Sequence, residues 1–205
     1  MTPADVQAHF TDADGNYRFA RWGRPIVPVV FGLDDLSLPV VKGAIEAVVT
    51  LAGHAISETD PEMGANLMVF FVADWDELAD VPDLEGLVPE LDGLLGRLKA
   101  EAANQYRLFR FERDGSIRAA FVFLRMDGAL AEMTAQDLTL AQVVQVILLW
   151  GVGAFSERSP LAMTGGVAVL RPEIAALIRA AYAPVLPGAA DDASHALRLF
   201  ARMGM

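Results

Sequence analysis

The sequence predicts an α+β fold, with a mixed sheet of about four or five strands packed on helices, a central apolar helix and a helical C-terminal part. Runs of β-branched and aromatic residues alternate with segments of helical periodicity before residue 126. The segment 138–155, "LTLAQVVQVILLWGVGAF", has no charged residue in a chain of formal net charge -11. Helical patterns dominate 171–205. Because no internal repeat or linker interrupts the chain, 1–205 is expected to form a single domain.

The N-terminal part of the chain is expected to contain one strand and one helix. Segment 1–20 is polar and rich in turn signals such as "DADGN". The β-branched run "IVPVVFG", 26–32, is typical of a strand, and Pro28 indicates a sheet edge or an irregular start. In the next segment Pro39 suits a first helical turn, apolar residues recur at helical spacing, and Gly53 suits the helix exit.

The middle of the chain predicts a central strand, a broken helix and a hairpin. "NLMVFFVADW", 66–75, is a continuous apolar run, which is typical of a strand buried on both faces. Leucines at helical spacing over 84–98 predict an amphipathic helix with a break near Pro89. In "YRLFRFERDGSIRAAFVFLR", two β-rich runs flank Asp114-Gly115, a pair that favours a tight hairpin turn.

The apolar segment 138–155 is predicted to be a buried helix. Its length is near the minimum for a membrane span, but it contains Gln142 and Gln145, has small residues near its end and lacks basic flanks. After it, "SERSPLAMTGG" is expected to be a loop and "VAVL" a short strand or turn. Within 171–205, "RPEIAALIRAAYAP" and "DDASHALRLFARM" are expected to be helices.

The amino-acid composition disfavours several classes of binding partner and of chemistry. Asp and Glu number 27 against 16 Lys and Arg, so binding to nucleic acid or to anionic membranes is disfavoured. The absence of cysteine excludes disulfides, cysteine-ligated zinc and thiol nucleophiles. The N-terminus has no signal-peptide pattern, which predicts a cytoplasmic protein, or a periplasmic or secreted one if a leader has been removed. We expect no membrane insertion and no cofactor.

Within the apolar segment, "AQVVQ" is the best match to the motif HExxH. In zincin metallohydrolases the two histidines of HExxH bind zinc from one helix face, and the glutamate activates the metal-bound water. Here Ala141 and Gln145 stand at the histidine positions and Gln142 at the glutamate position. In the extended metzincin pattern, Leu148 replaces the glycine and Gly151 the third histidine. Every ligand position is therefore empty, and glutamine cannot act as a base at neutral pH.

The element order, with a strand pair leading into one central apolar helix, resembles that of the zincins. More specifically, the chain resembles a bacterial family of uncharacterised proteins with a degenerate zincin-like fold. The parallels are "RFARWGRPIVPVVFG" at the first strand, "QVILLW" at Gln145–Trp150 and "YAPVLPG" at Tyr182–Gly188. The resemblance implies a zincin-like α+β fold without zinc ligands, and it implies no activity.

Three functions stay open at the level of sequence. The first is a non-catalytic pseudo-metallohydrolase whose remnant cleft, near Gln142, Gln145 and Trp150, binds a peptide or a small ligand; no catalytic or metal-binding residue is assigned. The second is a hydrolase with an unrecognised carboxylate site. Its carboxylate pairs, such as Asp60 with Glu62, stand at helix starts or loops, where capping also explains them. The third is an interaction module that forms a homodimer through Leu149, Trp150 and the tail "FARMGM".

Overall fold

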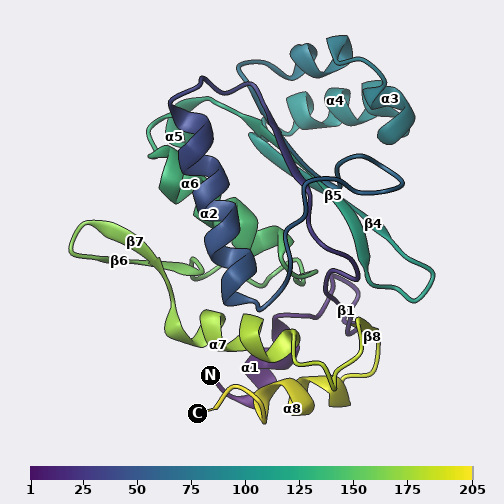
Figure 1. Cartoon of the computed structure of the whole chain (residues 1–205), viewed down its shortest axis with the longest axis vertical. Coiled ribbons are helices and arrows are strands. Elements are labelled where there is room, and N and C mark those ends of the chain that lie inside the picture. The colour runs from purple at the N-terminus through teal and green to yellow at the C-terminus, as the bar shows by residue number, and fades with distance from the viewer. Residues whose placement is uncertain (205) are drawn as a thin grey trace.

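The computed structural model, described here for residues 1–204, confirms an α+β fold built on a mixed four-stranded sheet (Figure 1). The strand order is β2-β3-β5-β4, and helices cover both faces of the sheet. β2, β3 and β5 run parallel, while β4 runs antiparallel to β5 at one edge. The strands span Pro28–Phe31 (β2), Leu67–Val72 (β3), Gln105–Phe111 (β4) and Ile117–Arg125 (β5).

β3 is an interior strand of this sheet, as its unbroken apolar sequence predicted. All six of its residues are buried. Leu67, Val69 and Phe71 pack into the core on one face, while the alternate residues pack into a second core on the other face. Of the two possibilities that Pro28 indicated, a sheet edge or an irregular start, the structure shows the edge, since β2 pairs only with β3.

Two groups of helices form the layers on either side of the sheet. α2 (Ser37–Leu51) packs against α6 (Ala135–Val146) on one face. The other face carries the 3-10 helix η1 (Trp75–Asp80) with α3 (Leu84–Leu87) and α4 (Leu91–Ala100). The predicted break near Pro89 is confirmed, because α3 and α4 are separated at this point.

The β4–β5 hairpin turns at Asp114-Gly115 as predicted. Gly115 adopts a φ of 84°, which favours glycine, and the carboxylate of Asp114 accepts hydrogen bonds from the backbone N–H and the hydroxyl of Ser116. The chain then passes through the single-turn helix α5 (Gly128–Ala131) into α6.

A third group of elements lies beyond one end of the sheet, where both termini are found (Figure 1). It comprises α1 (Pro3–Ala8), α7 (Pro172–Ala181), α8 (Ser194–Phe200) and the short pair β1 (Phe19–Ala20) with β8 (Ala189–Ala190). The C-terminal segment thus contains the two predicted helices, as α7 and α8, with a non-helical stretch that includes β8 between them.

The prediction that 1–20 is a polar, turn-rich segment is incomplete. Thr2 caps α1 in a capping box with Asp5, and Val6 on this helix is fully buried. Phe10, Tyr17 and Phe19 are buried as well. A one-and-a-half-turn helix presents too few apolar residues for a periodic signal, so the sequence pattern did not reveal it.

The segment after α6 contains a hairpin that was predicted as a loop followed by a short strand or turn. β6 (Leu161–Thr164) pairs antiparallel with β7 (Val167–Leu170), and the pair projects from the body of the protein (Figure 1). Gly165 and Gly166 form its turn, both with positive φ.

The prediction of one helix over 138–155 is wrong at both ends. α6 begins at Ala135, where Thr134 caps it, and ends at Val146. Beyond that point the chain is extended: Leu148 forms a β-bridge with Arg21, and the N–H of Leu149 donates to the carbonyl of Ala20 at 2.9 Å. Pairing with a distant segment replaces helical hydrogen bonds that the local sequence alone would have favoured.

Aromatic side chains satisfy the carbonyls that this early helix end leaves free. The indole N–H of Trp150 donates to the carbonyl of Val144 at 2.7 Å, and that of Trp22 donates to Val146 at 2.8 Å. The hydroxyl of Tyr182 donates to the carbonyl of Ile147 at 2.8 Å. Because unpartnered buried carbonyls are costly, these three donors explain how α6 can end inside the core.

Across residues 1–204, no helix has the length and apolar character needed to cross a membrane. The run that raised this question is divided between α6 and the extended segment that follows it.

His195 on α8 makes the stability of the fold sensitive to acid. Its ring is buried, with Nδ1 hydrogen-bonded to the hydroxyl of Tyr17 at 2.9 Å. Burial, together with the charges of Arg198 and Arg202, lowers the pKa of His195 to about 4. An unfolded chain with a histidine pKa of 6.5 therefore binds more protons between these values.

We expect the free energy of unfolding to fall by about 3 kcal/mol as the pH decreases from above 6.5 to about 4, mainly through His195. Urea titrations at half-unit pH intervals would measure it. Between pH 6.5 and about 5, above the range where carboxylates such as Asp60 contribute, the slope in H195Q should flatten to the smaller contribution of His54, whose pKa burial also lowers. An unchanged slope in H195Q would refute the assignment.

Candidate functional site

The two glutamines of the AQVVQ register face a single arginine on the edge strand. Arg107 of β4 donates from Nη1 to the Oε1 of Gln142 at 2.7 Å, and from Nη2 to the Oε1 of Gln145 at 2.5 Å. Residues three apart on a helix lie on neighbouring turns of one face, so one guanidinium reaches both amides. The structure therefore brings Gln142 and Gln145 together on a partner that sequence reasoning missed.

A further amide completes this polar group, and every amide in it is bonded. Gln105 accepts from Nη1 of Arg107 at 3.0 Å and from Nε2 of Gln142 at 3.1 Å. Gln145 uses its own Nε2 to donate to the carbonyl of Ala141 at 3.3 Å. Gln142 is only 4% exposed, so this bonding is what makes its burial tolerable.

Arg107 is a cation without a counter-ion. Among residues 1–204 no carboxylate lies within 4.0 Å of its guanidinium, and its three acceptors are neutral amide oxygens. Burial lowers the pKa of Arg107 to about 10, so the side chain still carries its charge at neutral pH. The site thus holds one positive charge against the side chains of Gln142 and Gln145.

A hollow of about 360 Å³ lies beside this cation. Arg107 and Phe109 line it from β4, and Gln145 lines it from α6. The remaining wall is formed by residues of the loop after α6, namely Trp150, Gly151, Val152, Phe155 and Ser156. Arg107 and Phe109 are two residues apart on β4. Side chains alternate between the two faces of a strand, so both point to the face covered by α6. Arg110 points to the other face of β4, where it donates to the carbonyl of Leu87 on the α3 side of the sheet.

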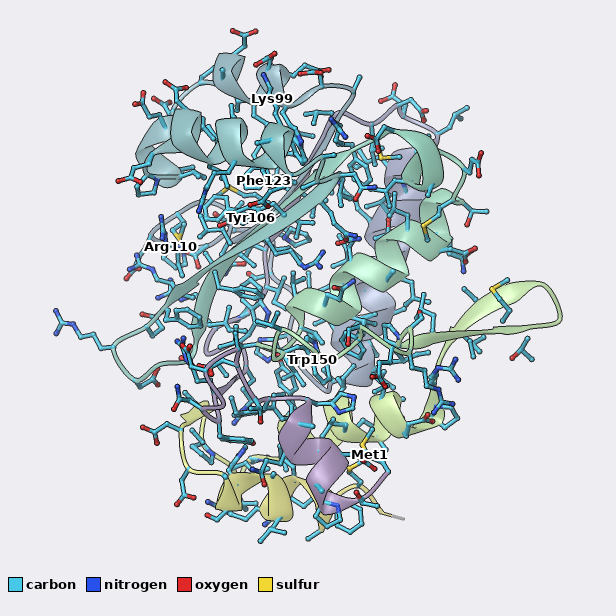
Figure 2. The ribbon with its side chains drawn as sticks, turned by 180° about the vertical axis from the view of Figure 1, so that it is seen from behind. Met1, Lys99, Tyr106, Arg110, Phe123 and Trp150 are labelled. Carbon is cyan, nitrogen blue, oxygen red and sulfur yellow. The ribbon has the colours of Figure 1, made fainter. Side chains whose placement is uncertain are left out.

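Trp150 lines this hollow and also packs against the hydrophobic core. Its ring stacks on Phe10 with centroids 5.3 Å apart and meets Phe155 edge-on at 4.9 Å. Figure 2 shows Trp150 beneath the end of α6, whereas Tyr106, Phe123 and Arg110 lie toward α4. Its indole N–H is already bonded within the protein, so Trp150 offers a ligand an apolar ring surface.

The residues of the AQVVQ register do not fit a zinc ion. Zinc in proteins is bound by imidazole, thiolate or carboxylate groups, and Ala141, Gln142 and Gln145 supply none of these. The guanidinium of Arg107 also occupies the space against both amide oxygens and would repel a metal cation. Over residues 1–204, no three His, Cys, Asp or Glu side chains are grouped so as to hold a metal.

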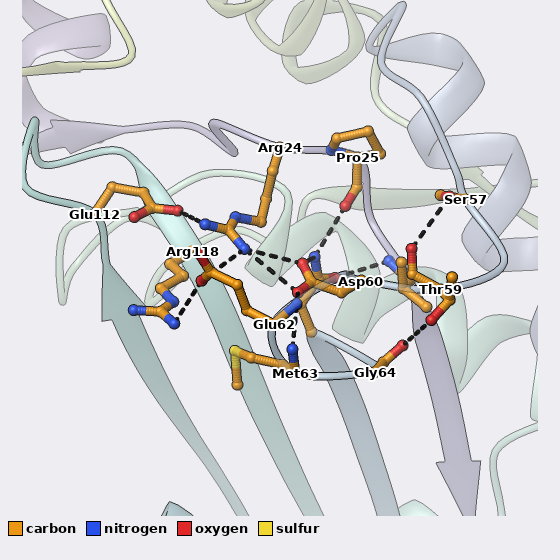
Figure 3. A network of polar contacts seen from close by, with 12 residues as sticks. Arg24, Pro25, Ser57, Thr59, Asp60, Glu62, Met63, Gly64, Glu112 and Arg118 are labelled. Atoms are coloured by element: carbon orange, nitrogen blue, oxygen red, sulfur yellow. Dashed lines mark hydrogen bonds and ion pairs between the residues drawn. The ribbon is translucent and has the colours of Figure 1, made fainter.

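The carboxylate pair Asp60–Glu62 belongs to a structural network (Figure 3). The buried Asp60 accepts from the backbone N–H groups of Glu62 and Met63 and from the side chains of Arg24 and Asn66. Burial alone would raise the pKa of Asp60, but these donors together lower it to about 2. A carboxylate this acidic and this fully bonded is a poor base, and its role is to hold the loop before β3.

The histidines, and Ser156 of the loop after α6, are dispersed. Nδ1 of His9 bonds the carbonyl of Asp5, Nε2 of His54 bonds that of Arg24, and His195 lies within α8. The hydroxyl of Ser156 donates to the carbonyl of Gly153 and has no histidine partner. None of these arrangements provides a nucleophile with its base.

Comparisons with family models, with curated proteins and with solved structures give no match for this chain.

Arg107 could have been found from the sequence by its parity. In "YRLFRF" it alternates with Tyr106 and Leu108, and its spacing of two from Phe109 and four from Phe111 predicts that all three lie on one face of the strand. An arginine among aromatic residues on the covered face of a strand indicates a buried charge that needs polar partners. The glutamines of the apolar helix are those partners.

Proposed function

We propose that the protein is a non-catalytic, zincin-like binding domain, a pseudo-metallohydrolase whose remnant cleft binds a peptide or small ligand beside Arg107. The observation that carries this proposal is the guanidinium of Arg107 between Gln142 and Gln145. This fixed cation would exclude a metal from the two glutamines, and it lines an open hollow to which a ligand has access.

The order and placement of elements support the zincin-like part of the proposal. The β4–β5 hairpin leads through α5 into α6, and α6 packs on the sheet with its AQVVQ face toward the edge strand β4. This is the arrangement, a strand pair followed by a central helix, on which the resemblance rests. The helix is shorter than the sequence predicted, but it includes the whole AQVVQ register.

Two alternatives receive less support. A carboxylate-based hydrolase needs an acidic group free to accept a proton, and Asp60, the most buried carboxylate, is bonded on both oxygens. A dimerisation surface around Trp150 and Met203 is disfavoured because Met203 is buried and Trp150 packs on Phe10 and Phe155.

A hydrolysis screen tests the absence of catalysis. The purified chain should give no protein-dependent turnover of generic peptide and ester substrates, with or without added zinc. Turnover that disappears when one Asp or Glu is replaced by its amide would overturn the proposal in favour of the carboxylate hydrolase. Light scattering over a dilution series would separately reveal self-assembly.

A further inference from the structure

We propose that the hollow beside Arg107 binds the carboxylate of a small, apolar monocarboxylic acid. This inference rests on the proposed function, because it names the ligand class of the same cleft. It depends on the unused donors of Arg107, on the rigidity of its side chain, and on the chemistry of the surrounding wall.

Arg107 retains two donor hydrogens after its contacts within the protein are counted. A guanidinium has five N–H groups. Both hydrogens of Nη1 are used, toward Gln105 and Gln142, and one hydrogen of Nη2 is used, toward Gln145. Within residues 1–204, the Nε–H and the second Nη2 hydrogen have no acceptor. Adjacent N–H groups of one guanidinium form the planar fork that takes a carboxylate through two parallel hydrogen bonds.

The fork is held in place before any ligand arrives. Gln142 and Gln145 belong to α6 and fix the two terminal nitrogens, while Gln105 braces both Arg107 and Gln142 from the same strand. Three acceptors on two packed elements leave the arginine little freedom to lose on binding. Such preorganisation lowers the entropic cost of association.

Charge and shape select a monoanion with an apolar body. Arg107 is the one charged residue on the wall of the hollow, and it has no carboxylate partner there. A single guanidinium balances the one charge of a carboxylate but leaves half the charge of a phosphate dianion uncompensated, so we expect the carboxylate to be preferred. Around the cation, Gln145, Gly151 and Ser156 form a polar part of the wall, while Phe109, Trp150, Val152 and Phe155 offer the rest of the ligand an aromatic and aliphatic side. A volume of about 360 Å³ suits a small organic acid.

The test is isothermal titration of the purified chain with phenylacetate, with phenylacetamide and with inorganic phosphate. We expect phenylacetate to bind at one site per chain, phenylacetamide to bind at least tenfold more weakly, and phosphate not to compete. The substitution R107M should weaken phenylacetate binding at least tenfold. R107K should also weaken it, because an ammonium group has no planar fork.

R110M is the matched control. Arg110 lies on the same strand, three residues away, and its guanidinium bonds on the opposite face of the sheet. R110M should therefore bind phenylacetate as the wild-type chain does. An equal loss in R110M would mean that general charge, and not the Arg107 fork, attracts the acid, and it would overturn the proposal.

A second measurement uses the wild-type chain and does not depend on the folding of any variant. In a ¹⁵N–¹H NMR titration with phenylacetate, the indole signal of Trp150 should shift, while those of Trp22 and Trp75 should stay. These two rings are buried elsewhere, at 1% and 0% exposure. Equal binding of the acid and the amide, no binding of either, or shifts confined to Trp22 or Trp75 would each refute the proposal.

The two proposals fail in distinguishable ways. Catalytic turnover would refute the proposed function, whatever binds to Arg107. Failure of phenylacetate to bind a chain that is also inactive would refute only the carboxylate ligand.

Discussion

Replacing Trp22 by alanine should lower the free energy of unfolding by about 5 kcal/mol. The Trp22 ring is 1% exposed, and a cavity of this size typically costs about 3–5 kcal/mol. The substitution also leaves the carbonyl of Val146, at the end of α6, without its donor, which adds about 1–3 kcal/mol where water cannot enter. Denaturant unfolding followed by circular dichroism would measure the change.

The loss of unfolding free energy that comes from the indole hydrogen bond can be separated from the loss that comes from burial of the Trp22 ring. W22F keeps much of the apolar volume and removes the indole N–H, so it should cost about 2 kcal/mol. W75F is the matched control, because the Trp75 N–H donates to the carbonyl of Ala103 in a partly exposed position that water can reach. A loss in W22F no larger than that in W75F would contradict the account of how α6 ends.

Replacing Gly151 by alanine should destabilise the protein by about 3 kcal/mol. A Cβ at this position would lie 2.1 Å from the backbone oxygen of Thr11, so one of the two segments must move. Movement is resisted because the N–H of Gly151 donates to the carbonyl of His9 at 2.7 Å. The expected result is a lower thermal midpoint, measured by differential scanning calorimetry.

Gly153→Ala provides the control two residues further along the same loop. A Cβ there would meet only the hydroxyl of Ser156, at 4.0 Å, which is an ordinary contact. We expect a change of less than about 0.5 kcal/mol. Equal destabilisation by both substitutions would show that the loop as a whole requires glycine, and that the close approach of Gly151 to Thr11 is not the cause.

Local sequence patterns were sufficient to predict those elements whose structure is determined by their own residues. The unbroken apolar run of β3, the break at Pro89 and the turn at Asp114-Gly115 each have a local physical cause, and the structure confirms all three. Such signals depend on burial periodicity, a missing N–H or a permitted positive φ, all of which act within a few residues.

The end of α6 could not be predicted in this way. Nothing in "VILLWGVG" forbids a longer helix before its glycines, and the actual end at Val146 depends on partners from distant parts of the chain. Leu149 bonds Ala20, while Trp22 and Tyr182 supply donors from residues more than thirty positions away. Tertiary contacts of this kind override local propensity.

The two glutamines of the candidate site could be predicted from the sequence, but their pairing with Arg107 could not. Gln142 and Gln145 attracted attention because amides in an apolar run need partners. Their partner, Arg107, precedes them by 35 and 38 residues on another element, and only the sheet register brings it to the same face. Strand parity could have flagged Arg107 as buried, but no local rule links it to this helix.

The guanidinium of Arg107, and not a metal, is expected to occupy the side of α6 that carries Gln142 and Gln145. The most direct measurement is the zinc content, by plasma mass spectrometry, of protein purified without chelator and then equilibrated with zinc and desalted. We expect well below one zinc per chain, with no difference between the wild type and Q145A. One zinc per chain in the wild type, lost in Q145A, would contradict the claim.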